Sequence, residues 1–253
     1  MMNLEHRLDR TVTILARRET VFRYFTDNER WAKWWGKGST VEAHPGGRVR
    51  ILYPNAIEVT GEVLEVVPPE RISFTYGFTT GTPIPPGSSR VTISLEEDGA
   101  ATRLHLLHEF SDAKARDEHV QGWRYQLALF SNIVSDEVNA GAGERIDAWL
   151  DAWSDADASS RASVLARIAV PNVKFRDRYG ATNGVDDLLP HIAAAQHFMP
   201  GVRLERQGEV QQCQGSAFCN WNATANGGVI GKGTTFFTLD AEGRIESVTG
   251  FWS

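Results

Sequence analysis

The feature that most constrains the fold of this chain is one long amphipathic helix, predicted over residues 113–138. Its large apolar side chains recur at spacings of four, three and four, so they form one stripe along the helix: Trp123, Leu127, Phe130 and Val134. A stripe of this kind must be buried against a second layer of structure. The preceding residues have the pattern of β-strands, which predicts an antiparallel sheet curved around this helix.

Strand-like runs separated by turns precede the long helix. The run 71–78 is apolar or aromatic at every second residue, which indicates that one face of the sheet is buried. Two short helices are expected before these runs, one over residues 19–25 and one after a cap at Asp27 or Asn28. The predicted strands cover residues 8–14, 48–53, 57–67, 71–78, 90–95 and 102–110.

Aromatic side chains gather in these predicted elements. A sheet that curls over a helix leaves a gap between them, and aromatic rings around such a gap form an apolar pocket. Core packing is the alternative use for one or two of the tryptophans. The predicted ligand-binding residues of this half are Trp31, Trp34, Trp35, Phe74, Tyr76, Phe78 and Trp123.

A known pattern of short segments occurs in order in this half: residues 16–27, Trp34-Trp35, 44–47, 61–72, 102–106 and Gly122-Trp123. Together they resemble the START-like (SRPBCC) superfamily, in the branch similar to the activator of the heat-shock-ninety ATPase. The resemblance implies a helix-grip domain over residues 1–138, in which a curved antiparallel sheet surrounds a long C-terminal helix and leaves a ligand cavity. It implies neither activation of the chaperone nor a fixed catalytic residue.

Composition excludes several classes of function. The net charge of −6 and the lack of a run of Lys or Arg argue against a nucleic-acid partner. Cys213 and Cys219 are expected to be reduced core thiols rather than a disulfide. Neither a metal-binding spacing nor a glycine-rich phosphate loop occurs, so no metal and no cofactor are expected. Without an apolar leader or a window of ~20 apolar residues, a cytoplasmic location is expected.

The second half begins after a linker predicted at residues 139–143, which are small and lack apolar periodicity. Helices, a short strand and then four strands follow, which predicts a cone-shaped α+β barrel domain over 144–253 and the α+β class for the whole chain. The helices are expected around Ile146–Trp153 and over 160–168 and 186–198, and the strands over 173–177, 202–213, 216–225, 229–239 and 244–252.

Four segments of this half carry a second resemblance: residues 149–157, 175–177, 184–189 and 243–252. They are similar to the SnoaL-like branch of the nuclear-transport-factor-like superfamily. Asp177 then resembles the catalytic aspartate of steroid isomerases in that superfamily. Those isomerases also have an oxyanion hole, in which two side chains donate hydrogen bonds to the substrate oxygen. The matching positions here are Trp149 and Thr235, which do not reproduce this hole, so steroid isomerisation is not expected.

Asp177 is the candidate catalytic residue on sequence grounds as well, because its strand face is otherwise apolar. An ion pair with Arg176 or Arg178, or a cap on the helix near Gly184, is the alternative role for its carboxylate. His191 and His197 lie six apart on one helix and are expected at the surface or rim. The predicted ligand-binding residues of this half are Trp149, Phe175, Tyr179, Trp221 and Thr235.

Three functions fit this sequence. The first is the binding or carriage of a small hydrophobic or amphipathic ligand in two tandem apolar cavities. The second is an isomerase or cyclase with Asp177 as general base, and the third is an interaction protein like the chaperone-ATPase activators. No membrane span is expected, and a homodimer is predicted through the sheet of residues 202–252.

Overall fold

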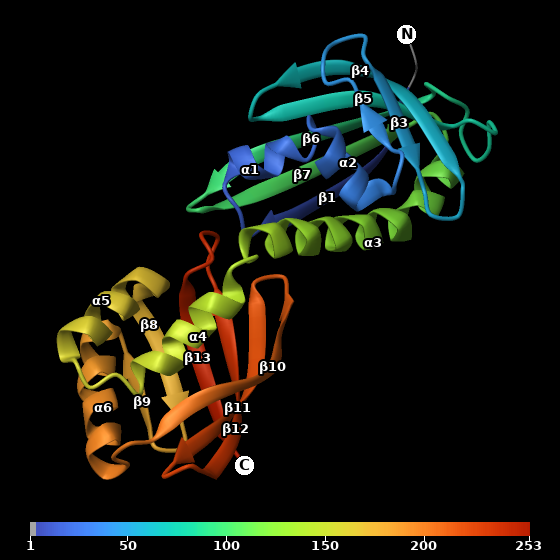
Figure 1. Cartoon of the computed structure of the whole chain (residues 1–253). Helices are drawn as coiled ribbons and strands as arrows, with labels where there is room; N and C mark the ends of the chain where they lie inside the picture. Colours follow the sequence, from blue (N-terminus) through green and yellow to red (C-terminus); the bar gives the residue numbers. More distant parts are fainter. Residues whose placement is uncertain (1–3) are drawn as a thin grey trace. The chain divides into compact units, whose positions relative to one another are not determined.

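The computed structural model describes residues 4–253, and the chain divides into two compact units with the boundary after Val134. Each unit has one sheet among its described residues, with strands in the order β1-β7-β6-β5-β4-β3-β2 in the N-terminal unit and β10-β11-β12-β13-β8-β9 in the C-terminal unit. Helices pack against both sheets (Figure 1). The chain is therefore of the predicted α+β class.

The N-terminal sheet is antiparallel throughout. Figure 1 shows the long helix α3 running along this sheet, with the short helices α1 and α2 beside it. This is the predicted helix-grip arrangement. The elements are β1 (His6–Ile14), α1 (Arg18–Arg23), α2 (Asn28–Trp35), β2 (Thr40–Val41), β3 (Arg48–Leu52), β4 (Glu58–Val67), β5 (Arg71–Phe78), β6 (Ser89–Asp98), β7 (Ala101–Phe110) and α3 (Ala113–Val138).

Local sequence signals position both helices that flank the N-terminal core. Asp27 caps α2, since its carboxylate accepts a hydrogen bond from the backbone N–H of Arg30 at 3.0 Å. Along α3, the side chains of the predicted stripe are all buried, from Trp123 to Val134. Burying each large apolar side chain stabilises the fold by about 1.5–3 kcal/mol, so this stripe fixes the helix on the sheet.

The C-terminal sheet is antiparallel except where β13 pairs with β8 in parallel. Three helices cover its inner face, whose apolar side chains form one core. The sheet curves without closing into a barrel (Figure 1). The elements are α4 (Ala142–Ala152), α5 (Ala158–Ile168), β8 (Ala169–Asp177), β9 (Gly180–Asn183), α6 (Val185–Phe198), β10 (Arg203–Cys213), β11 (Ser216–Ala225), β12 (Gly228–Leu239) and β13 (Ile245–Trp252).

Several details differ from the sequence-based expectations. The short strands β2 and β9 were not predicted, because neither has enough residues to show a pattern. In the segment 139–143, residues 139–141 form a turn and α4 begins at Ala142. Asn139 is buried, and its amide is bonded to the Ser135 hydroxyl. Cys219 is a buried free thiol as expected, whereas Cys213 is exposed and is not a core residue.

Two further findings concern residues 4–253. None of their helices is long and apolar enough to cross a membrane. The same residues include no group of three or more His, Cys, Asp or Glu side chains that could hold a metal ion.

Candidate functional site

The C-terminal unit contains a cavity of about 560 Å³. This volume is within the range of roughly 300–1,000 Å³ that small-molecule sites occupy. Three ionisable side chains lie on its lining among apolar ones, namely Asp177, His191 and the predicted ligand-binding residue Tyr179. Its apolar wall includes Trp153, Phe198, Met199, Val202, Leu204 and Trp252.

Hydrogen bonds fix the carboxylate of Asp177 at the end of β8. Its Oδ1 accepts from the backbone N–H groups of Tyr179 at 2.8 Å and Gly180 at 3.1 Å, which caps the turn into β9. Its Oδ2 accepts from the indole Nε1–H of Trp252 at 3.2 Å. Within residues 4–253, neither neighbouring arginine forms an ion pair with it, so that alternative for Asp177 is not realised.

A second, small cavity of about 40 Å³ adjoins Asp177 toward the core. Thr235 lines it and accepts a hydrogen bond from Trp221 Nε1–H at 2.8 Å. Thr235 pairs with Gly250 across the β12–β13 ladder, and the missing side chain at Gly250 leaves room between Thr235 and Asp177. The structure thus brings Asp177 and four predicted residues to one cavity, namely Trp149, Phe175, Trp221 and Thr235.

Glycines set the position of the aromatic rings at this end of the unit. Trp221 and Trp252 meet edge to face with centroids 4.7 Å apart. A side chain at Gly233 would overlap the Trp221 ring and the Phe251 carbonyl, and one at Gly231 would lie 3.3 Å from the Trp252 ring. The two indoles can therefore approach β12 closely and direct their N–H groups at Thr235 and Asp177.

His191 is a lining residue that the sequence-based interpretation placed at the rim. It lies on α6, and its ring packs against Trp153 and Phe175 at centroid distances of 5.8 and 5.5 Å. Gly180 makes this possible, because a Cβ there would lie 2.7 Å from the His191 ring. His197 is exposed, as expected.

The N-terminal unit contains a cavity of about 300 Å³ between α3, the end of α2 and the sheet. Buried side chains form its floor, namely Trp35, Trp123 and Gln126. Exposed residues lie at its mouth, among them Ile57, Gly122 and Tyr125. No Asp, Glu, His, Lys or Arg is among the lining residues.

A chain of buried hydrogen bonds lies behind this cavity. Trp123 Nε1–H donates to His108 Nδ1 at 2.9 Å, so the proton of the neutral imidazole is on Nε2. Nε2–H then donates to the Ser89 hydroxyl at 2.8 Å, which donates to the Tyr76 carbonyl at 2.8 Å. Burial, and to a smaller extent His119, holds the pKa of His108 well below its usual range.

Two tyrosine hydroxyls meet between the cavity and the core. Tyr53 lines the cavity, and its hydroxyl lies 3.2 Å from that of the buried Tyr76. Burial raises the pKa of Tyr53 and raises that of Tyr76 well above its usual value. Both phenols therefore stay neutral, and one of them donates its proton to the oxygen of the other.

The predicted aromatic residues of this unit divide between cavity and core. Trp35, Phe78 and Trp123 line the cavity. The other predicted residues are buried away from it: Trp31, Trp34, Phe74 and Tyr76. The core-packing alternative thus holds for two of the tryptophans.

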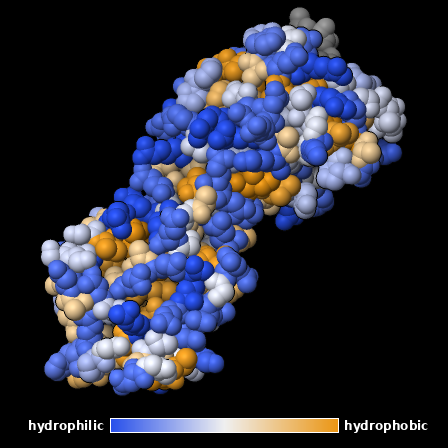
Figure 2. All heavy atoms as spheres, in the orientation of Figure 1, coloured by the Kyte–Doolittle hydropathy of each residue, from blue (hydrophilic) through white to orange (hydrophobic). Residues whose placement is uncertain are grey.

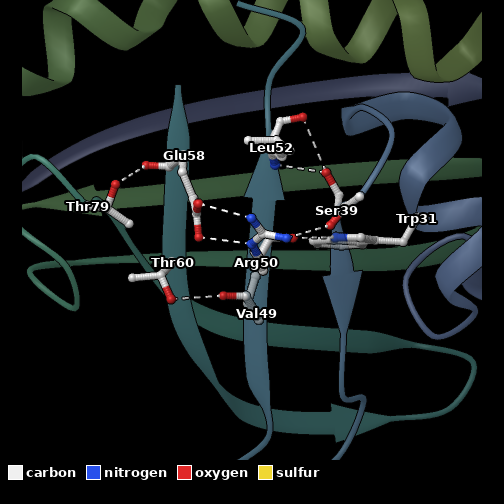
Figure 3. Close-up of polar contacts among 9 residues, drawn as sticks. Trp31, Ser39, Val49, Arg50, Leu52, Glu58, Thr60 and Thr79 are labelled. Carbon is white, nitrogen blue, oxygen red and sulfur yellow. Dashed lines mark hydrogen bonds and ion pairs between the residues drawn. The ribbon is translucent and has the colours of Figure 1, made fainter. Parts of the chain in front are cut away.

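Figure 3 shows what the Trp31 indole does instead: it approaches the main chain of Arg50, whose carbonyl accepts its N–H at 3.3 Å. The guanidinium of Arg50 pairs with both carboxylate oxygens of Glu58 at 2.9 and 3.1 Å and lowers the pKa of Glu58. Ser39 ties β2 to Leu52 through its hydroxyl. These contacts hold α2 and β3 in place beside the cavity.

The family model described as activator of Hsp90 ATPase homolog 1-like protein matches residues 15–135. Residues 15–135 form an AHSA1-like domain. The lining residues of the N-terminal cavity all lie within this domain.

The chain is also similar to solved structures, each with a TM-score of 0.42. An AHSA1-like protein from Rhizobium etli is 30% identical over 51% of this chain and 81% of its own. A SnoaL-like family protein from Agrobacterium tumefaciens is 24% identical over 44% of this chain and 95% of its own. The Aha1 dimer from Colwellia psychrerythraea is 13% identical over 48% of this chain and 90% of its own. No curated protein matches the chain.

Some lining residues were missed by sequence reasoning. In the C-terminal cavity they include His191 and Trp252, and in the AHSA1-like domain they include Tyr53 and Gln126. A signal existed for Trp252, because alternation along β13 places it on the same face as the core residue Val248. Tyr53 lies just past the end of β3, where no periodicity identifies the direction of a side chain.

Proposed function

We propose that the protein binds small apolar or amphipathic molecules in the cavities of both units, with the C-terminal cavity as the principal site. The observation that carries this proposal is the cavity of about 560 Å³, in which an apolar wall surrounds Asp177 and His191. Apolar walls remove the body of a ligand from water, and a few polar groups orient it. The AHSA1-like domain supports a second, smaller site.

Native mass spectrometry of the full chain tests this proposal by counting bound molecules of N-phenyl-1-naphthylamine, a neutral apolar probe. Ala195 lines the cavity, so Ala195→Trp fills it. Ala193 is exposed on the same helix and away from the cavity, so Ala193→Trp is the matched control. We expect Ala195→Trp to bind one probe fewer than the wild type and the control to bind the same number. Equal counts in all three proteins would rule out the C-terminal site.

A second candidate function is proton transfer on a carbonyl compound, with Asp177 as the base. The observation that favours it is the oriented carboxylate beside the Thr235 hydroxyl and the His191 ring, all on adjoining cavities. The carboxylate would take a proton from the carbon next to the carbonyl, and the electron pair would move to the oxygen to give an enolate. A hydroxyl or imidazole N–H then stabilises that oxygen.

Exchange of the α-protons of 2-tetralone in D₂O, followed by NMR, tests this activity. We expect Asp177→Asn to lower the exchange rate at least 100-fold, because the amide cannot accept the proton. Asp186 is exposed at the start of α6, so Asp186→Asn should exchange at the wild-type rate. Exchange no faster than in buffer for the wild type would remove this candidate and leave the binding proposal standing.

A further inference from the structure

Among residues 4–253, the carboxylate of Asp177 has no cationic partner. The hydrogen bonds that it accepts come from neutral N–H groups, namely two of the backbone and the indole of Trp252. Of the described residues that line its cavity, none is Lys or Arg. Asp177 is half-buried, so much of its negative charge remains uncompensated beside an apolar wall. Such a carboxylate favours a ligand that carries a positive charge.

The carboxylate can accept a further hydrogen bond from a ligand. A carboxylate has about four lone-pair sites, and Oδ2 of Asp177 uses one of them for Trp252 Nε1–H at 3.2 Å. The bond from the Tyr179 N–H to Oδ1 is exposed to solvent, so the carboxylate is not sealed in the core. Asp177 lines both the large cavity and the small one that adjoins it. Oδ2 therefore keeps an acceptor site for a donor in the cavity.

Aromatic rings line the same cavity as this carboxylate. Tyr179 and Trp252 meet edge to face with ring centroids 5.4 Å apart, and Trp153 and Phe198 add two more rings. The π face of an aromatic ring attracts a cation, most strongly for Trp and more strongly once the cation has left water. Outside the lining, the exposed Arg178 already makes such a contact, with its guanidinium 5.4 Å from the centre of the Tyr179 ring. The rings and the carboxylate together suit an organic cation.

His191 adds a second acceptor on the lining. Trp153 and Phe175 pack against its ring, and its nitrogens form no hydrogen bond within residues 4–253. Asp177 and His191 both approach Gly180, whose N–H donates to the carboxylate and whose Cβ, if present, would lie 3.2 Å from His191 Nδ1. An imidazole nitrogen without a proton accepts a hydrogen bond. A protonated amine has several N–H donors and can therefore bond to both side chains.

We propose that the C-terminal cavity binds organic cations, namely protonated amines on an apolar or aromatic body, with Asp177 as the counter-ion. The ammonium group donates hydrogen bonds to Asp177 and His191, and the apolar body lies against Trp153, Phe198 and Trp252. This rests on the proposed binding function and specifies the ligand class of its principal site. It also excludes organic anions, because a second negative charge beside Asp177 is repelled.

Three naphthalenes of nearly equal size test the preference for charge. They are 1-naphthylmethylamine, which is protonated at neutral pH, 1-naphthalenemethanol, which is neutral, and 1-naphthoate, which is an anion. Calorimetric titration measures each Kd on the full chain and on Ala195→Trp, so the binding that this variant loses belongs to the C-terminal cavity. We expect the amine to bind there about tenfold or more tightly than the alcohol, and naphthoate to bind most weakly.

Asp177→Asn removes the charge and keeps the size of the side chain. We expect it to weaken the amine about ten- to a hundredfold and to change the alcohol by less than about twofold. Asp186→Asn is the matched control, because it makes the same change of net charge at an exposed position on α6 and should bind all three probes as the wild type does. Circular dichroism establishes that both variants are folded, and the order of the probes on the wild type needs no variant at residue 177.

Failure of this inference and failure of the binding proposal give different results. If the alcohol or naphthoate binds this cavity as tightly as the amine, recognition of a cation is wrong while binding in the cavity stands. The same holds if Asp177→Asn weakens the amine and the alcohol equally. If no probe binds more weakly to Ala195→Trp than to the wild type, the C-terminal site itself is wrong, and this inference falls with it.

Discussion

Protonation of His108 is opposed by its hydrogen bonds as well as by its burial. A positively charged imidazole would present N–H groups on both nitrogens, and Nδ1 would then face the N–H of Trp123, which can only donate. His119 shares this environment, since its ring lies 5.3 Å from that of His108 and burial lowers its pKa too. Two histidines of the AHSA1-like domain are thus kept neutral in the folded state.

We predict that the free energy of unfolding falls as the pH drops below about 6.5. The unfolded histidines take up protons there, whereas the folded ones do so only at the lower pH set by their depressed pKa values. Above pH 6.5 the unfolded histidines are neutral too, so no stability is lost there. Below it, the free energy of unfolding falls by up to about 1.4 kcal/mol per pH unit for each histidine. Urea unfolding between pH 7.5 and 5.5, followed by tryptophan fluorescence, measures it.

Two variants check the assignment of this slope. His119→Phe keeps the ring contacts with Tyr76 and Phe110 and removes one titrating group, so its stability should depend less on pH. His197 is exposed on α6 in the C-terminal unit, where folding does not remove its ring from water, so His197→Gln should keep the wild-type slope. A steeper dependence in His119→Phe than in the wild type would contradict this account.

At the scale of elements, the sequence predicts what depends on local chemistry. Helix α3 has the predicted ends, residues 113 and 138, because its apolar stripe is long. Asp27 caps α2 as predicted, because a carboxylate can accept a hydrogen bond from an N–H group of the first turn. The strands of both sheets, apart from β2 and β9, were expected from alternation and turn residues. The pair β8 and β13 shows the limit: each was predicted, but their parallel pairing joins segments far apart in the sequence.

The cavities depend on packing between elements, so the sequence predicted their residue types better than their lining. Trp34 and Trp35 are adjacent, yet Trp34 is buried in the core with its N–H bonded to the Tyr24 carbonyl, whereas Trp35 lines the cavity. Which of the two lines the cavity depends on the rotation of α2 against the sheet. His191 was misplaced for the same reason, because its inward direction depends on the close approach of Gly180 from β9.

At the scale of the whole molecule, aromatic side chains remain exposed on the outer face of the C-terminal sheet. Phe218, Phe236 and Phe251 lie on β11, β12 and β13, with successive ring centroids 5.3 and 6.0 Å apart. Phe236 and Phe251 are 49% and 56% exposed, and they point away from the helices that cover the inner face. The face of the molecule drawn in Figure 2 is mainly hydrophilic, with separate hydrophobic patches.

We predict that the chain forms a homodimer through this outer sheet face, because a row of three phenylalanines gains free energy when a second copy covers it. Light scattering at micromolar concentration should give twice the mass of one chain for the wild type. Phe236→Lys places a charge at the centre of the row and should yield a monomer with an unchanged fold. Phe198→Lys is the matched control, since Phe198 is 79% exposed on α6 and outside the row, and it should remain dimeric. A wild-type protein with the mass of one chain would exclude this interface, and a dimeric Phe236→Lys would place the contact elsewhere.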